Sequence, residues 1–181
     1  MQNSIECKLA VIGDNGVGKS SLCEVFVKDK FSAGYNPNEE EFYRQKIRIN
    51  NLDVTLDILD INFTSPIFQK LVHQADCFLF VYDITNEHSV ERLLSLYKEI
   101  LILKEHKKLP KVLIGNKCDI FDKREVGYDL GLKLSMEWGC QFIEVSAKLN
   151  TRVAQAFTQC ANYLSEVNEM RVKQKHCCCV T

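Results

Sequence analysis

Eight residues near the start of the chain have the types and spacing that bind phosphate: Gly13-Asp14-Asn15-Gly16-Val17-Gly18-Lys19-Ser20 fits the pattern GxxxxGK[ST]. In such a loop, glycines let backbone N–H groups turn inward, and the helix that follows adds positive potential. Lys19 would reach the terminal phosphates, and the Ser20 hydroxyl would ligate Mg²⁺. A plain glycine-rich turn explains neither side chain. The predicted phosphate contacts are Gly13, Asn15, Gly16, Val17, Gly18, Lys19, Ser20 and Ser21.

A second group of residues has the chemistry to select the base. In Asn116-Lys117-Cys118-Asp119, the Asp119 carboxylate can accept from two neighbouring donors on guanine, a pair that adenine does not offer. Asn116 and the aliphatic stem of Lys117 would fix and cover the ring, and Ser146-Ala147-Lys148 would give a backbone N–H to the guanine oxygen. Alone, the segment from Asn116 to Asp119 could be a solvated turn. Because it follows a phosphate loop, it predicts a guanine nucleotide site.

These side chains need a fold that brings distant segments of the chain together at one edge of a sheet. Short apolar runs predict buried strands at Cys7–Ile12, Val54–Leu59, Cys77–Ile84, Val112–Ile114 and Phe142–Val145. Helical spacing predicts helices over Val90–Leu101 and Val153–Val167, and another through Leu130 and Leu134 that stops at Gly139.

An antiparallel pair of strands is expected on either side of Asn50-Asn51. Together these elements predict an α/β fold in three layers, with a mainly parallel sheet and helices on both faces.

Composition limits the class of protein. The chain has 181 residues, 46% hydrophobic and 26% charged, which suits one domain. Its 23 basic and 24 acidic residues give a net charge of −1, so the overall charge of the protein does not attract a nucleic-acid backbone. The longest apolar run, Cys77–Tyr82, is far shorter than the roughly 20 residues of a spanning helix. The start, Met1–Glu6, resembles neither a signal peptide nor a myristoylation site, so we expect a cytosolic protein.

The nine cysteines fall into two groups. Six are isolated and are predicted to be small buried hydrophobic residues: Cys7, Cys23, Cys77, Cys118, Cys140 and Cys160. The other three, Cys177 to Cys179, are adjacent near the end of the chain, which indicates a chemical rather than a structural role in a tail. His73, His88 and His106 share no metal-ligand spacing, and zinc binding by His176 with the three cysteines is a weak alternative.

On these motifs the chain resembles the Ras superfamily of small GTPases from Cys7 to its end, and Leu56-Asp57-Ile58-Leu59-Asp60 is similar to the Ras branch. The resemblance implies a P-loop NTPase fold with a six-stranded sheet, a monomeric GTPase domain over residues 1–170 and a flexible tail over 171–181. It also implies a Mg²⁺-dependent GTP/GDP switch in signal transduction. Phe31 would then lie edge-on against guanine, and Asp60 would hold Mg²⁺ through water. Tyr35–Glu41 would face effector proteins, with an exchange factor and an activating protein as further partners.

The chain departs from that family where the third phosphate is sensed. Asn38 replaces a threonine that ligates Mg²⁺, and its amide oxygen would ligate only with altered reach. Ile61-Asn62-Phe63-Thr64 replaces threonine-alanine-glycine-glutamine, and the segment up to Cys77 is shorter than in the family.

Of the catalytic positions, Lys19 is kept, whereas Thr64 is too short to orient water. Phe63 is expected to add bulk near the third phosphate, and Asn15 to narrow the entry for an arginine. We therefore expect slow GTP hydrolysis, with Gln69 as the alternative water-orienting residue.

The carboxyl terminus fits a lipidation signal. Cys178-Cys179-Val180-Thr181 matches a prenylation box with Cys178 as acceptor, and Cys177 suits palmitoylation. The ending also resembles the paired-cysteine tails of the Rab branch, which would modify Cys178 and Cys179. An unmodified tail is the third possibility. Lipidation would place the protein on the cytoplasmic face of a membrane, with the plasma membrane favoured.

Two other function classes stay open at this point. The chain could be a pseudo-GTPase, an interaction module that binds nucleotide without switching, because Asn38, Phe63 and Thr64 depart together from the family pattern. The phosphate loop alone would also suit an ATP-dependent kinase or ATPase, but Asp119 argues against that class.

Overall fold

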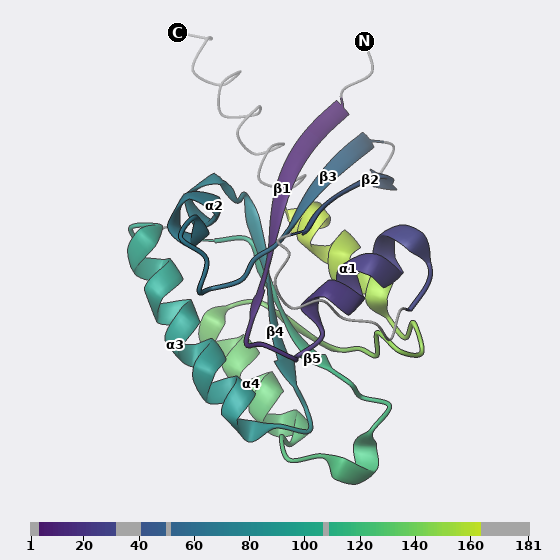
Figure 1. Cartoon of the computed structure of the whole chain (residues 1–181), viewed down its shortest axis with the longest axis vertical. Helices are drawn as coiled ribbons and strands as arrows, with labels where there is room; N and C mark the ends of the chain where they lie inside the picture. The colour runs from purple at the N-terminus through teal and green to yellow at the C-terminus, as the bar shows by residue number, and fades with distance from the viewer. Residues whose placement is uncertain (1–3, 32–40, 50–51, 107–108, 164–181) are drawn as a thin grey trace, which may run out of the picture.

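One mixed sheet organises the protein (Figure 1). The computed structural model describes residues 4–31, 41–49, 52–106 and 109–163. Within them, six strands run in the order β2-β3-β1-β4-β5-β6. The pair β2 and β3 is antiparallel, and the other neighbours are parallel. The strands are β1 (Ser4–Gly13), β2 (Glu41–Ile49), β3 (Leu52–Asp60), β4 (Cys77–Asp83), β5 (Lys111–Asn116) and β6 (Gln141–Glu144).

Helices cover both faces of the sheet, which makes three layers. They are α1 (Lys19–Lys28), α2 (Phe68–Gln74), α3 (Glu87–Leu103), α4 (Tyr128–Trp138), the short 3-10 helix η1 (Phe121–Lys123) and a helix over residues 153–163. Side chains of α1 and of residues 153–163 belong to one hydrophobic core, and side chains of α2, α3 and α4 belong to a second. None of the helices in the described part of the chain combines the length and apolarity needed to span a bilayer.

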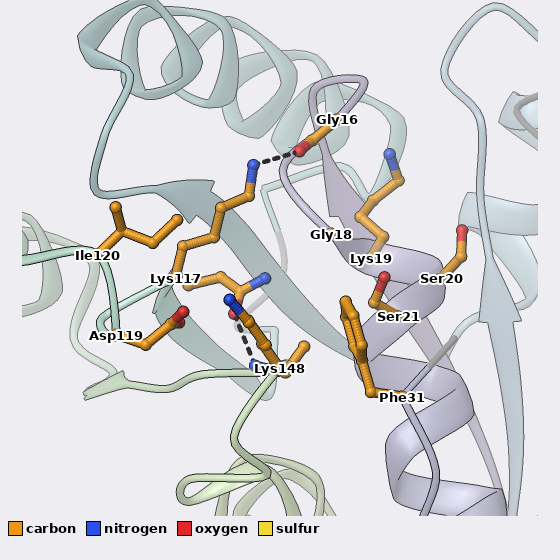
Figure 2. A pocket seen from close by; sticks show the side chains of 12 residues that line it. Gly16, Gly18, Lys19, Ser20, Ser21, Phe31, Lys117, Asp119, Ile120 and Lys148 are labelled. Carbon is orange, nitrogen blue, oxygen red and sulfur yellow. Dashed lines mark hydrogen bonds between the residues drawn. The ribbon is translucent and has the colours of Figure 1, made fainter. Parts of the chain in front are cut away.

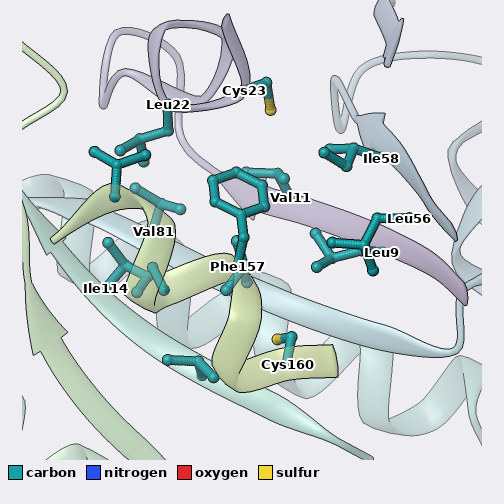
Figure 3. Packing of buried hydrophobic residues seen from close by; sticks show 14 of the residues in the cluster. Leu9, Val11, Leu22, Cys23, Leu56, Ile58, Val81, Ile114, Phe157 and Cys160 are labelled. Carbon is teal, nitrogen blue, oxygen red and sulfur yellow. The ribbon is translucent and has the colours of Figure 1, made fainter. Parts of the chain in front are cut away.

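Aromatic side chains fill both cores. On the α1 side, Phe157 points at the sheet (Figure 3) and stacks on Phe26 with 4.2 Å between ring centroids. On the other side, Tyr97 of α3 stacks on Trp138 at the end of α4, with centroids 3.8 Å apart. Phe80 of β4 meets both rings edge-on. Edge-to-face and offset stacking are the arrangements that aromatic quadrupoles favour, so these rings join sheet and helices.

The predicted fold class is confirmed, together with the strands, the antiparallel pair and the helix stop at Gly139. That glycine adopts the left-handed region at φ 61° and ends α4. Helix α2 was not predicted. The structure describes the last helix only to residue 163, so the predicted extension to Val167 lies outside the described residues, as do Asn50-Asn51 and the tail.

The cysteine prediction needs a correction. Four of the isolated cysteines are buried, but Cys118 and Cys140 are only half-buried. Cys118 lies on the loop between Lys117 and Asp119, Cys140 lies between α4 and β6, and both pack against the margin of the second core.

Parallel pairing brings the ends of the strands to the same edge of the sheet. Strand register sets Val11 opposite Asp60, Gly13 opposite Val81 and Asp83 opposite Asn116. The residues that follow these strands therefore meet at one edge, where ligands bind in open α/β sheets.

Candidate nucleotide-binding site

A pocket opens at this edge of the sheet (Figure 2). Its lining comes from four separate segments of the chain. The residues are Gly16, Gly18, Lys19, Ser20, Ser21, Phe31, Asn116, Lys117, Asp119, Ile120, Ala147 and Lys148. All of them except Ile120 were predicted from sequence. Ile120 follows Asp119 directly, but its side chain has no polar atom that would mark it as a ligand contact.

The phosphate loop has the backbone that its glycines predict. Gly16 and Gly18 have φ of 77° and 94°, a region that other residues rarely adopt. At Gly13, a Cβ would lie 2.3 Å from the Val81 carbonyl oxygen, so only glycine lets β1 pass β4 there. Asn15 is exposed and does not line the pocket, and Val17 is buried beneath the loop.

Lys19 lies beneath the loop with 6% of its surface exposed. Its ammonium donates to the carbonyl oxygens of Gly13 at 3.1 Å and Asp14 at 2.9 Å. Burial lowers the pKa of Lys19, and the negative charges of Asp60 and Asp14 oppose that effect. A buried Lys19 ammonium enclosed by the backbone of the phosphate loop is suited to bind phosphate oxygens.

Two of the side chains predicted to hold Mg²⁺ meet beside the lysine. The Ser20 hydroxyl at the start of α1 donates to the Asp60 carboxylate at the end of β3. Burial raises the pKa of Asp60, while the Ser20 hydrogen bond and the charge of Lys19 act in the opposite direction. Hydroxyl and carboxylate oxygens fit Mg²⁺, which commonly takes one or two protein ligands and completes its shell with phosphates and water. Asn38, the third predicted ligand, lies outside the described residues.

No metal site was predicted at His73, His88 and His106, and zinc at His176 with the tail cysteines was a weak alternative. Within the described ranges, no group of three or more His, Cys, Asp or Glu residues is placed to hold a metal ion. His73, His88 and His106 are part of that search, whereas His176 lies outside the described residues.

On the base side, Asn116 joins three segments. It is 1% exposed; its amide donates to the Val17 carbonyl at 2.8 Å, and its side-chain oxygen accepts from the Ala147 N–H at 3.2 Å. The Ala147 N–H, one of the three considered for the guanine oxygen, is thus already bonded within the protein. Ser146 is buried outside the pocket lining, and its hydroxyl donates to Asp119 Oδ1 at 2.5 Å. The predicted base selector is therefore oriented by a buried hydroxyl.

Lys117 and Phe31 form the walls on either side of the base pocket. Figure 2 shows the Lys117 stem on one side and the Phe31 ring on the other. The Lys117 ammonium donates to the Gly16 carbonyl at 2.8 Å, and Phe31 is 40% exposed. A planar base between the Lys117 stem and the edge of the Phe31 ring would be shielded from water on both sides, while its polar edge stays free for hydrogen bonds.

The segment that replaces the family's glutamine does not reach this pocket. Thr64 is exposed, and its N–H and hydroxyl both donate to Asn62 Oδ1, at 3.1 and 2.9 Å. Gln69 is exposed on α2. Neither residue lines the pocket.

The expectation that Phe63 adds bulk near the third phosphate is wrong. Its ring packs against the core formed with α2, α3 and α4, and the Arg92 guanidinium of α3 lies 4.3 Å from its centroid. A cation over an aromatic face is attracted by the ring's quadrupole, which favours this direction of the side chain.

Fold and site together define a P-loop protein that binds guanine nucleotides. Comparison with known families matches residues 8–166 to the Ras family. The chain is also 36% identical over 155 residues to Ras-like protein 2 of Mucor circinelloides f. lusitanicus, an alignment that covers 84% of this chain and 78% of that protein. The chain therefore belongs to the Ras family, and it is a small GTPase with a signalling function. The predicted resemblance is confirmed.

Proposed function

We propose that this protein is a lipid-anchored guanine nucleotide switch in which GTP hydrolysis is slow. The binding half of the cycle rests on Lys19, Ser20, Asp60 and Asp119, which the fold brings to one edge. The observation that supports slow GTP hydrolysis is the position of Thr64. Its hydroxyl and N–H both bond to Asn62, and Thr64 does not line the pocket.

Phosphoryl transfer depends mainly on positioning the attacking water and neutralising charge on the third phosphate. Lys19 supplies positive charge from beneath the loop, and the backbone N–H groups of residues 13–18 orient the phosphates. Mg²⁺ held by Ser20, and by Asp60 through water, would neutralise further charge when bound. Thr64 and Gln69 are the two candidates for holding the water; Thr64 bonds to Asn62, Gln69 is exposed on α2, and neither lines the pocket. Nucleotide binding without efficient hydrolysis is the expected result.

Single-turnover hydrolysis of preloaded GTP tests this proposal. We expect a rate below that of ordinary Ras-like relatives, with little gain from a Ras-type activating protein. Gln69→Ala should leave the rate unchanged, because Gln69 is exposed on α2. An ordinary rate that Gln69→Ala also leaves unchanged would show that the missing glutamine is not the limiting factor. An ordinary rate that falls with Gln69→Ala would make Gln69 the substitute.

One observation favours a second candidate, an interaction module whose shape does not follow the nucleotide. The Arg92 contact on Phe63 joins the segment after β3 to α3, and the Thr64 hydrogen bonds to Asn62 fix the turn within that segment. Limited proteolysis of the GDP and GTP forms separates the two candidates, since a switch changes its cleavage pattern and a fixed module does not. Arg92→Ala should loosen the segment in both forms.

The membrane part of the proposal rests on the sequence of the tail. Cys178 would carry a prenyl group and Cys177 or Cys179 a second lipid, since a single chain binds membranes only marginally. The protein would then act at the cytoplasmic face of the plasma membrane and meet effectors through Tyr35–Glu41, under control of an exchange factor and an activating protein. Intact-mass analysis from a eukaryotic host, with membrane fractionation, tests this. An unmodified mass and a wholly soluble distribution would remove the membrane claim.

A further inference from the structure

A carboxylate outside the pocket lining holds one wall of the base pocket. Asp83, the last residue of β4, has a side chain that is 8% exposed, and its Oδ2 lies 2.6 Å from the Lys117 ammonium. The same ammonium donates to the Gly16 carbonyl at 2.8 Å. The Lys117 ammonium therefore bridges the end of β4 and the phosphate loop, and Lys117 lines the pocket.

Asp83 is itself fixed before it meets the lysine. Its Oδ1 accepts from the Thr85 N–H at 2.9 Å and from the Thr85 hydroxyl at 2.8 Å. Its backbone N–H donates to the hydroxyl of Ser89, a residue of α3 that is 0% exposed. Sheet register also sets Asp83 beside Asn116, the residue before Lys117. The carboxylate is thus a preorganised anchor.

Lys117 needs such an anchor. Its backbone adopts the left-handed region at φ 65°, which non-glycine residues seldom occupy. Its stem is long and has many rotamers, so a free side chain would cover the base only part of the time. A buried carboxylate on one side and a carbonyl on the other restrict the ammonium to one place. A charge-assisted hydrogen bond is also stronger than a neutral one, so the Asp83 contact is the firmer of the two.

We propose that Asp83 is a positioning residue of the guanine site, which prolongs the residence of GDP and GTP by holding Lys117 over the base. This inference rests on the proposed nucleotide-binding function and adds a residue that touches no nucleotide itself. Asp83 acts through Lys117, so its effect should vanish when the lysine's charge is gone. That dependence distinguishes positioning from a general contribution to the fold.

The test is the release of fluorescently labelled GDP from the full-length protein. Asp83→Asn keeps an oxygen that accepts from Thr85 but removes the charge that pairs with Lys117. We expect release about tenfold faster, the equivalent of one lost, partly exposed charge-assisted hydrogen bond. Lys117→Met should accelerate release at least as much, and the Asp83→Asn/Lys117→Met double variant should match Lys117→Met alone. Thr85→Val should give a smaller acceleration in the same direction.

Asp57→Asn is the matched control, because Asp57 pairs with Arg44 at 2.6 Å on the sheet surface and does not line the pocket. Its release rate should equal that of the parent. Unchanged release in Asp83→Asn would overturn the inference, and so would an Asp83→Asn effect that persists in full in the Lys117→Met background. If Asp83→Asn does not fold, unchanged release in Thr85→Val overturns it. A parent protein that binds no labelled GDP would overturn the proposed function as well.

Discussion

Replacing Asp119 by asparagine should change the base that the protein prefers. Asp119 lines the pocket, and its Oδ1 already accepts from the buried Ser146 hydroxyl at 2.5 Å. That bond orients the carboxylate and leaves lone pairs on both oxygens for the two neighbouring donors of guanine. Asparagine has one oxygen and one amide group, so it can accept from one guanine donor but opposes the other with its own N–H.

The size of the effect follows from the bonds lost. A hydrogen bond to a charged group contributes about 1.5–3 kcal/mol and a neutral one about 0.5–1.5 kcal/mol, so losing one charged bond and making the other neutral costs about 2.5–4.5 kcal/mol. At about 1.4 kcal/mol per tenfold, GDP should bind about a hundredfold to a thousandfold more weakly. Xanthine has an oxygen where guanine has its exocyclic amine, and that oxygen can accept from the new amide. Xanthosine diphosphate should therefore recover much of the lost affinity.

Competition against labelled GDP measures both nucleotides in the parent and in Asp119→Asn. Ser146→Ala is the control: it keeps the carboxylate but frees it, so GDP should weaken modestly with no gain for xanthosine diphosphate. The placement of the base is refuted if Asp119→Asn binds GDP as tightly as the parent and ignores xanthosine diphosphate. Equal shifts for Ser146→Ala and Asp119→Asn would mean that orientation, rather than charge, dominates.

Three further outcomes are expected. Asp60→Asn should abolish the acceleration of GDP release by EDTA, because that acceleration depends on Mg²⁺ held at Asp60. Burial raises the pKa of Asp60. In the parent, the EDTA effect should therefore shrink as pH falls from 7 toward that pKa, because protons then displace Mg²⁺. Tyr82→Phe should raise the free energy of unfolding by about 1 kcal/mol in urea denaturation, since within the described residues the buried Tyr82 hydroxyl has no hydrogen-bond partner. Gly131→Ala should lower it by about 1–3 kcal/mol, because its Cβ would lie 2.3 Å from Phe142 Cζ and 2.5 Å from the Tyr82 oxygen. A Gly131→Ala protein as stable as the parent would contradict this packing.

Residues whose chemistry is local were predictable from sequence. The phosphate loop and Asp119 carry their functional groups within short contiguous motifs, and buried strands alternating with helices imply the edge where they meet. Helix α2 escaped prediction because it has seven residues, too few for a helical period to stand out, and no side-chain cap at its start.

The direction of Phe63 and the role of Asp83 depend on partners far along the chain. Phe63 packs against the second core with Arg92 over its ring, and nothing near Phe63 in the sequence indicates these partners. Asp83 did leave a signal, since an acid ends an otherwise apolar strand. Its partner Lys117 was already assigned to the base, and the link between them appears only when β4 and β5 lie side by side.

The stacked pair of Tyr97 and Trp138 gives the protein a built-in optical probe. Trp138 is the single tryptophan of the chain, so all indole emission comes from one place. At 3.8 Å, Tyr97 will pass its excitation energy to the indole, and separation of α3 from α4 will restore tyrosine emission while the indole spectrum moves to longer wavelength. Neither ring lines the nucleotide pocket. Emission will therefore follow the opening of this helical layer without an added dye and without direct contact with the bound nucleotide.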